Sequence, residues 1–285
     1  MPRRLRWVMV GILVGSGAVL APVQAQSALP IGGLFRPLLA DPKQPRFSAG
    51  YLWVSSTIRQ TQVGTAAFGE TFGLLRWPAG VVQDGLQLDL AAGVFAQFDL
   101  LTESMDLMNA DYLIGVPLTY RRGWFSARLR LYHQSSHLGD EYLLRTQAQR
   151  INLSFEAAEL VASARRGPWR VYGGGEYMIR HEPEDLRPGL WHGGLELRPP
   201  GRILRVGAVG EGRLVFGFDA KLWEQHDWAL GASAKAGLEF TPGGKPHAGG
   251  RRLSLLLEGY HGPSPYGQFF SEEVSYFGLS LGVGI

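Results

Sequence analysis

His133, Ser135 and His137 alternate along one stretch of the chain, and residues of these types could support nucleophilic catalysis. A histidine beside a serine hydroxyl can take its proton, so that the oxygen attacks an ester carbonyl. Residues 124–132, which lead into this stretch, alternate between apolar and polar side chains, as a β-strand with two unlike faces does. The same parity places both histidines and the serine on the apolar face, together with Leu131.

A serine nucleophile of this kind uses a third group that orients the histidine. Asp140 and Glu141 follow the strand, and either could fold back towards His133, although the sequence does not fix their direction. We therefore treat His133, Ser135, Asp140 and Glu141 as the candidate catalytic set. The alternative is a polar strand end without chemistry that emerges into the sugar layer of a membrane.

No metal site is expected at the two histidines. His133 and His137 are four strand positions apart, or ~13 Å in an extended chain, which is too far for a shared ion unless the chain turns between them. The three glycines at 173–175 are not followed by a predicted helix, so they do not form a phosphate loop. The sequence leaves the need for a cofactor open.

Residues 1–25 are predicted to be a secretory signal peptide that is cleaved after Ala25. Three arginines stand within residues 1–6, residues 7–20 are apolar, and small residues precede the cut. These arginines also account for the formal net charge of +3: the first 25 residues hold no acid, and +3 − 3 leaves 0. The basic composition is therefore no argument for a nucleic-acid partner. The absence of cysteine fits an exported bacterial protein.

The rest of the chain alternates in the same way as the stretch around His133. Residues 86–100 are the clearest case, because one face is wholly apolar and the other carries two aspartates and two glutamines. Segments of about ten alternating residues, separated by turns, are typical of a transmembrane antiparallel β-barrel. A soluble β-sandwich also alternates. The length of the segments, the aromatic residues at their ends and the alternating apolar C-terminus favour the barrel.

About twelve strands are expected in this all-β fold. They lie near residues 46–58, 65–77, 84–100, 108–121, 124–137, 149–165, 168–181, 188–198, 212–224, 228–241, 251–262 and 274–285. The stretch 198–212 is ambiguous and could hide a further pair.

The lengths of the connections predict which way the strands run. The connections at 121–123 and 165–168 are short and are expected in the periplasm, whereas those at 101–107 and 138–147 are longer and are expected outside the cell. From Phe125 to His133 the strand rises roughly 20 Å of an apolar band ~25 Å tall. His133 and Ser135 should thus face lipid close to the outer rim, where outer-leaflet esters lie.

A lipid-facing His-x-Ser near the outer rim resembles the dyad of the outer-membrane phospholipase A family and of the lipid A 3-O-deacylases. That resemblance implies that His133 is the base, that Ser135 is the nucleophile, and that an asparagine or acidic side chain orients the histidine. The phospholipase pattern continues with Asn-Gly after the serine, whereas this chain has Ser136 and His137. The third member is therefore left open.

A second resemblance covers most of the mature chain. The runs FRPLLADPKQPRFSAGY, NADY, RLYHQSSHLGDE, RINLSFE and SPYGQFF are similar to a bacterial family defined as domain of unknown function twelve hundred and seven. This resemblance implies an exported outer-membrane protein and assigns no activity.

The expected organisation is a signal peptide (1–25), an extended periplasmic lead-in (26–45) and a single barrel domain (46–285) in the bacterial outer membrane. Outer-membrane lipids, lipopolysaccharide and the barrel assembly machinery are the expected partners, and no nucleic acid is. Arg128 and Arg130 should form a lumen network with Glu156 or Glu176. Two functions stay open: a lipid acyl-ester hydrolase, and a non-enzymatic barrel that is either a narrow pore or a structural protein.

Overall fold

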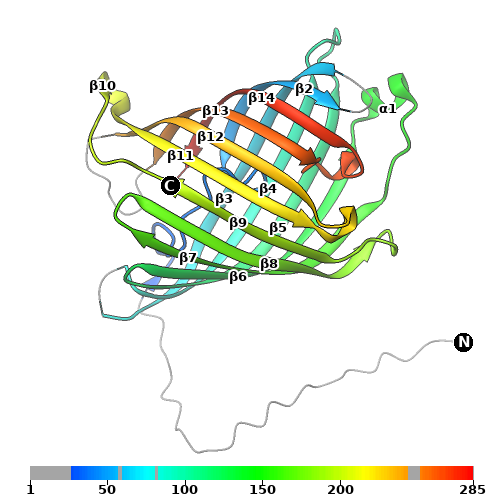
Figure 1. Ribbon diagram of the computed structural model, residues 1–285. Helices are drawn as coiled ribbons and strands as arrows, with labels where there is room; N and C mark the ends of the chain where they lie inside the picture. Colours follow the sequence, from blue (N-terminus) through cyan, green and yellow to red (C-terminus); the bar gives the residue numbers. More distant parts are fainter. Residues whose placement is uncertain (1–26, 57–59, 81–82, 243–250, 285) are drawn as a thin grey trace, which may run out of the picture.

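The computed structural model describes residues 27–284 except 57–59, 81–82 and 243–250, and it shows a closed antiparallel barrel (Figure 1). Strand β14 pairs with β2, which closes the ring of twelve strands. The strands of the ring are β2 (Phe47–Ser56), β3 (Gln60–Pro78), β4 (Gly85–Asp99), β5 (Leu107–Arg122), β6 (Phe125–Leu138), β7 (Leu153–Arg166), β8 (Trp169–Glu182), β9 (Gly189–Leu197), β11 (Gly210–Trp223), β12 (Ala229–Thr241), β13 (Arg252–Pro263) and β14 (Glu273–Gly284). Two short strands, β1 (Ser27–Ala28) and β10 (Leu204–Val206), pair with β3 and β11. Within the described residues, no helix is long and apolar enough to cross a membrane.

The predicted all-β barrel and its strand count are confirmed, and the side-chain alternation explains the closure. In β4 the polar positions, such as Gln87 and Asp89, are buried in the lumen, while Leu86 on the other face is exposed. A closed ring satisfies every ladder hydrogen bond without leaving an edge strand. Twelve strands of this alternation can therefore present an apolar band outside and a polar lumen inside.

Most strands begin and end within a few residues of their predicted bounds, with two larger differences. Strand β3 begins at Gln60 rather than 65, because residues 60–64 also pair with β2. Strand β7 begins at Leu153 rather than 149. The residues before it belong to a loop, where the side chain of Gln268 accepts a hydrogen bond from Ile151 N at 3.1 Å and donates one to Ile151 O at 2.9 Å.

The two ends of the barrel differ in their connections. The end where β2 begins and β14 ends, here called the terminal end, carries the turns at Gly123 and Gly167, whose φ angles of 59° and 57° suit glycine. The opposite end, here called the loop end, carries helix α1 (Asp140–Thr146) and the 3-10 turn η3 (Gly267–Phe269). Strand β6 runs from the terminal end to the loop end, so His133 and Ser135 lie in its last third.

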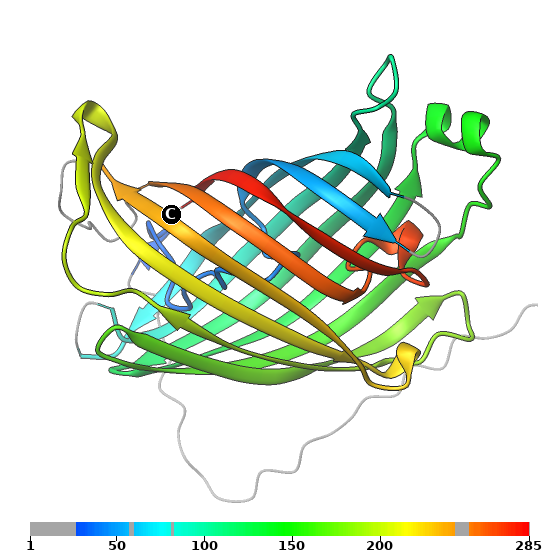
Figure 2. The ribbon, with the colours of Figure 1, turned by 45° about the horizontal axis from the view of Figure 1, so that its top comes forward.

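The described part of the predicted lead-in runs into the lumen and occupies its centre. Figure 2 shows this segment in dark blue inside the ring of strands. Phe35 and Leu38 pack on Val161 and Tyr172 of the barrel wall. Leu39 packs on a further part of the wall, against Val215 of β11 and Leu256 of β13. Residues 27–46, here called the lead-in, therefore act as the core of the barrel as well as its first segment.

The charges of the lead-in are compensated by strand residues. Lys221 Nζ donates a hydrogen bond to Asp41 Oδ1 at 2.9 Å, and Lys43 forms an ion pair with Asp111. Burial alone would raise the pKa of the Asp41 carboxyl, but the charge and hydrogen bond of Lys221 outweigh it and hold that pKa well below its usual range. These buried pairs fix the height of the lead-in in the lumen.

The lumen is also closed from the loop end. The turn η3 folds inward, so that Gly267 N donates to the Asp111 carboxylate and Gln268 N donates to Asn109 Oδ1 at 3.1 Å. Phe269 of η3 packs edge to face on Tyr142 of α1, with ring centroids 5.9 Å apart. Protein atoms thus occupy the loop end as well as the centre of the barrel.

The lumen network around Arg128 and Arg130 exists, but of its two predicted acids Glu156 was wrong. Glu159 of β7 accepts hydrogen bonds from Arg128 Nε at 2.8 Å and from Arg130 Nη2 at 2.7 Å. Glu156 lies on the other face of β7, since residues 156 and 159 differ in parity. Glu176 stands opposite Glu159 in the β7–β8 ladder, and its charge acts on Arg130.

Replacing Asp41 with asparagine should destabilise the fold, because Lys221 would be left as a buried charge without its partner. The expected loss is about 3 kcal/mol of unfolding free energy at neutral pH. Since the pKa of Asp41 is lowered in the folded state, the loss should shrink as the pH falls below ~4. Urea unfolding in detergent measures it, with the exposed Asp185→Asn as control. Equal stability of the two variants would contradict the anchoring role.

Candidate functional site

Strand β6 presents His133, Ser135 and His137 on the outer face of the barrel, as its parity predicts. The alternate residues Tyr132 and Gln134 are buried in the lumen. His133, Ser135 and His137 thus lie on the same outer face as the exposed Leu131, between the apolar part of that face and the loop end.

A carboxylate on the neighbouring strand contacts His133. Glu156 stands directly opposite His133 in the β6–β7 ladder, and its Oε1 lies 3.0 Å from His133 Nδ1. Both side chains remain accessible, at 41% and 46%. A carboxylate on Nδ1 fixes the ring and leaves Nε2 to act on a hydroxyl, which is the arrangement of a serine triad.

Ser135 lies two positions beyond His133 on the same face. Its hydroxyl makes no hydrogen bond with His133 within the described part of the chain, so the dyad is adjacent but not closed. Ser154 of β7 is its cross-strand neighbour on one side, and Tyr112 of β5 is on the other. A rotation of the His133 or Ser135 side chain is needed to bring Nε2 to the hydroxyl, and catalytic hydrogen bonds often tighten only when substrate binds.

The remaining predicted site residues lie above this row. Asp140 and Glu141 are exposed residues in the first turn of α1. His137 accepts a hydrogen bond at Nδ1 from Arg150 Nη2 at 2.9 Å, and its ring meets Tyr112 edge to face. The structure thus brings together His133, Ser135 and Glu156, and it places a guanidinium close to the rim on the same side.

The sequence reasoning missed Glu156 because it assigned the wrong face to the start of β7. Placing Glu156 in the lumen turns the alternate residues Leu153 and Phe155 towards lipid, but both point inward. Phe155 packs edge to face on Tyr132 in the lumen, with ring centroids 5.9 Å apart. The lumen holds apolar side chains beside the start of β7, so the usual polarity of the two faces is reversed at that place. Glu159 shares the parity of Phe155 and is buried. A charged residue at that parity was the sequence signal that Phe155, and not Glu156, faces the lumen.

A second serine and histidine meet on the outer face between β13 and β14. His261 Nδ1 lies 2.8 Å from Ser275 Oγ, and His261 Nε2 lies 3.5 Å from Glu273 Oε1. Here the serine contacts Nδ1 and the acid is at Nε2, the reverse of the arrangement at His133. His261 and Glu273 are also largely exposed, at 68% and 63%. These residues come from two strands, so a search for short motifs could not find them.

The lumen holds a cluster whose residue types could bind a metal. Ligand atoms of Asp41, His192 and Asp219 lie within 4.8 Å of one another. The protein already supplies donors to these carboxylates, since Tyr172 donates to Asp219 Oδ2 at 2.6 Å and Lys221 donates to Asp41. The cluster therefore acts as a buried ion-pair network that ties the lead-in to β9 and β11.

Several outer-membrane barrels of known structure superimpose on this chain. Outer membrane phospholipase A from Escherichia coli superimposes with a TM-score of 0.49 at 11% identity, over 84% of this chain and 91% of that chain. An active-site mutant of outer membrane phospholipase A from Escherichia coli gives a TM-score of 0.50 at 11% identity, over 87% of this chain and 92% of that chain. The β domain of the Bordetella autotransporter BrkA gives 0.40 at 12% identity, over 83% and 96%. At these identities the likeness shows the fold alone, that of outer-membrane barrels.

No curated protein matches the sequence. A family match spans nearly the whole chain, from residue 11 to residue 284. The protein therefore belongs to the family described as Protein of unknown function (DUF1207).

Proposed function

We propose that this barrel resides in the bacterial outer membrane and hydrolyses acyl esters of outer-leaflet lipids. His133 acts as the base and Ser135 as the nucleophile. Glu156 takes the orienting role for which Asp140 and Glu141 were the first candidates. The observation that carries the proposal is the 3.0 Å contact between His133 Nδ1 and Glu156 beside a serine on the same outward face.

The position of the three residues suits a lipid substrate. They lie on the outer face, near the loop end, directly above exposed apolar residues such as Leu129 and Leu131. An ester of an outer-leaflet phospholipid or lipopolysaccharide would lie at this height, with its acyl chain along the apolar face. Arg150, held on the same side by His137, supplies positive charge for a lipid phosphate.

The reaction follows from the roles of these groups. His133 Nε2 takes the proton of Ser135 Oγ as that oxygen attacks the acyl carbonyl carbon. The ester C–O bond breaks, the leaving alcohol takes the proton from His133, and the acyl group stays on Ser135. Water, deprotonated by His133, then releases the fatty acid and restores the serine. The Glu156 carboxylate stabilises the imidazolium that forms in both steps.

Fold analogy supports the proposal, since one of the superimposed barrels is an outer membrane phospholipase A. The filled lumen argues against the alternative of a narrow pore, because the lead-in and η3 occupy its centre and one end. A structural barrel is then the rival to hydrolysis. Assembly machinery of the outer membrane would insert either one.

A fluorophosphonate probe should form an adduct on Ser135, since it reacts only with base-activated hydroxyls. Peptide mass spectrometry of the folded protein in detergent locates the adduct. His133→Asn should abolish labelling, and Glu156→Gln should slow it at least ~10-fold. The neighbouring Ser154 provides the internal control, because it lies on the next strand beside Ser135 without a histidine two positions before it. Labelling at Ser154 as well would show general reactivity instead of activation.

Folded protein should release fatty acid from phospholipid or lipopolysaccharide vesicles, and Ser135→Ala should lower the rate by roughly 10³-fold or more. Ser275→Ala is the matched variant, because its serine also lies beside a histidine on the outer face. Loss of activity in Ser275→Ala alone would move the site to β13 and β14. Release from neither lipid by the parent protein would leave a structural barrel.

A further inference from the structure

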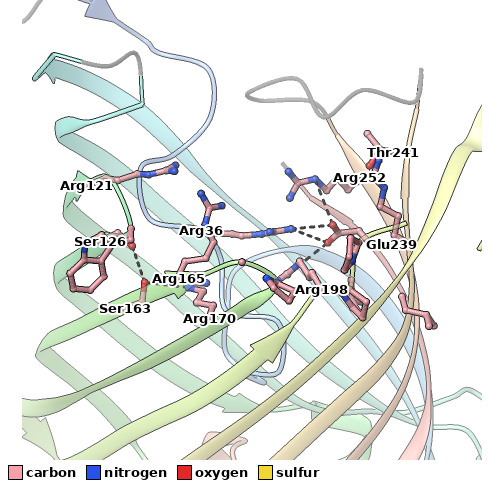
Figure 3. A pocket seen from close by; sticks show the side chains of 18 of the residues that line it. Arg36, Arg121, Ser126, Ser163, Arg165, Arg170, Arg198, Glu239, Thr241 and Arg252 are labelled. Atoms are coloured by element: carbon pink, nitrogen blue, oxygen red, sulfur yellow. Dashed lines mark hydrogen bonds and ion pairs between the residues drawn. The ribbon is translucent and has the colours of Figure 1, made fainter. Parts of the chain in front are cut away.

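A wide cavity opens inside the terminal end of the barrel, opposite the end that carries His133 and Ser135. Its volume is about 590 Å³, which lies within the range of ligand sites in other proteins. Figure 3 shows that side chains from the lead-in and from several separate strands converge on it. The cavity is therefore assembled by the closed barrel and not by a single loop.

Arginine dominates the walls. Seven guanidinium groups line the cavity, from Arg36, Arg121, Arg165, Arg170, Arg198, Arg213 and Arg252, against one acid, Glu239. The wall charge is thus 7 − 1 = +6. Two acids outside the wall form ion pairs with its arginines: Glu196 with Arg170, and Glu211 with Arg213. Counting them, the net charge is 6 − 2 = +4.

The single acid of the wall is shared among three arginines. Arg36 Nη2 donates to Glu239 Oε1 at 3.1 Å, while Arg198 Nη2 and Arg252 Nε approach the same carboxylate at 3.8 Å. Burial, together with the charge of Arg198, lowers the pKa of Arg36 to about 9. The guanidinium groups here repel one another more than one carboxylate can offset.

Several donors in the wall have no partner. Arg170 is only 6% exposed, and its Nε and Nη1 are held by Ser163 Oγ at 3.2 Å and Glu196 at 3.5 Å. Its Nη2 has no hydrogen-bond partner among the described residues, nor do the Nε atoms of Arg198 and Arg213. A buried guanidinium donor without an acceptor has lost its hydrogen bond to water and gained none in return, so these atoms mark where the acceptor of a ligand should stand.

We infer that this cavity binds a phosphate-bearing ligand that enters from the terminal end. Arginine forks match the paired oxygens of a phosphoryl group, and a net wall charge well above +1 favours a group with two or more negative charges. The cavity is also several times larger than one phosphate needs. Leu34 and Pro168 provide apolar atoms for the rest of the molecule.

Two sources could supply this chemistry: a soluble pyrophosphate or phosphomonoester, and the headgroup of a phosphorylated lipid. Titration calorimetry of the whole barrel in neutral detergent separates them. One arm uses inorganic pyrophosphate, and the other uses micelles with and without phosphatidic acid. Binding in either arm supports the site and identifies the source, whereas binding in neither overturns it. Citrate is the control for the chemical class of the ligand, because it is a polyanion without a phosphoryl group. If citrate binds as tightly as pyrophosphate, the cavity is a general polyanion surface and the phosphate assignment is overturned.

Arg36→Gln and Arg170→Gln should each weaken binding at least ~10-fold, and higher salt should weaken it further. Arg187→Gln is the matched control, since it removes an exposed arginine from the loop end. Arg213→Gln is a further variant, because Arg213 lines the cavity, is 41% exposed and takes no part in the pairs that hold the lead-in. It should also weaken binding, and it keeps the experiment decisive if Arg170→Gln fails to fold. Affinity that is unchanged in Arg36→Gln, or lowered equally in Arg187→Gln, would overturn the site.

Discussion

Three of the four charges that the lead-in carries into the lumen meet an opposite charge on the barrel wall, and the rest of the structure depends on these pairs. The fourth, Arg46, donates instead to the backbone carbonyls of Leu38, Leu39 and Asp41. Arg36 meets Glu239 of β12, Asp41 meets Lys221 of β11, and Lys43 meets Asp111 of β5. Taking a charge out of water costs several kcal/mol unless a partner of good geometry compensates for it. The three pairs come from different parts of the ring, so together they hold the lead-in in one position.

The occupied lumen restricts where this protein can act. Its centre holds packed apolar residues and compensated charges, and its loop end is capped by η3. Among the described residues, two regions carry the functions proposed above: the outer face near His133 and the arginine-lined cavity at the terminal end. They lie at opposite ends of the barrel, so ligands would reach them from opposite sides of a membrane.

The alternation of polar and apolar residues was sufficient to predict the barrel, its twelve strands and the outward direction of His133 and Ser135. Alternation reports which residues share a face, but it says which face is outside only where the lumen is polar. At the start of β7 the lumen is lined by Phe155, so the rule failed and Glu156 was assigned inward. The arginine cavity was beyond prediction because its residues lie between positions 36 and 252 and meet only after closure.

The pairing of the lead-in with distant strands has a consequence for the order of folding. Arg36 is separated from Glu239 by 203 residues, and Asp41 from Lys221 by 180. Contacts so far apart in the chain form late, because the entropy of closing the intervening loop is lost first. Arg36 and Asp41 thus wait for the last third of the chain before their charges are neutralised, whereas Lys43 already finds Asp111 in β5. A chain cut short before β11 would leave Arg36 and Asp41 without their partners, so the last strands are needed to hold the lead-in inside the barrel.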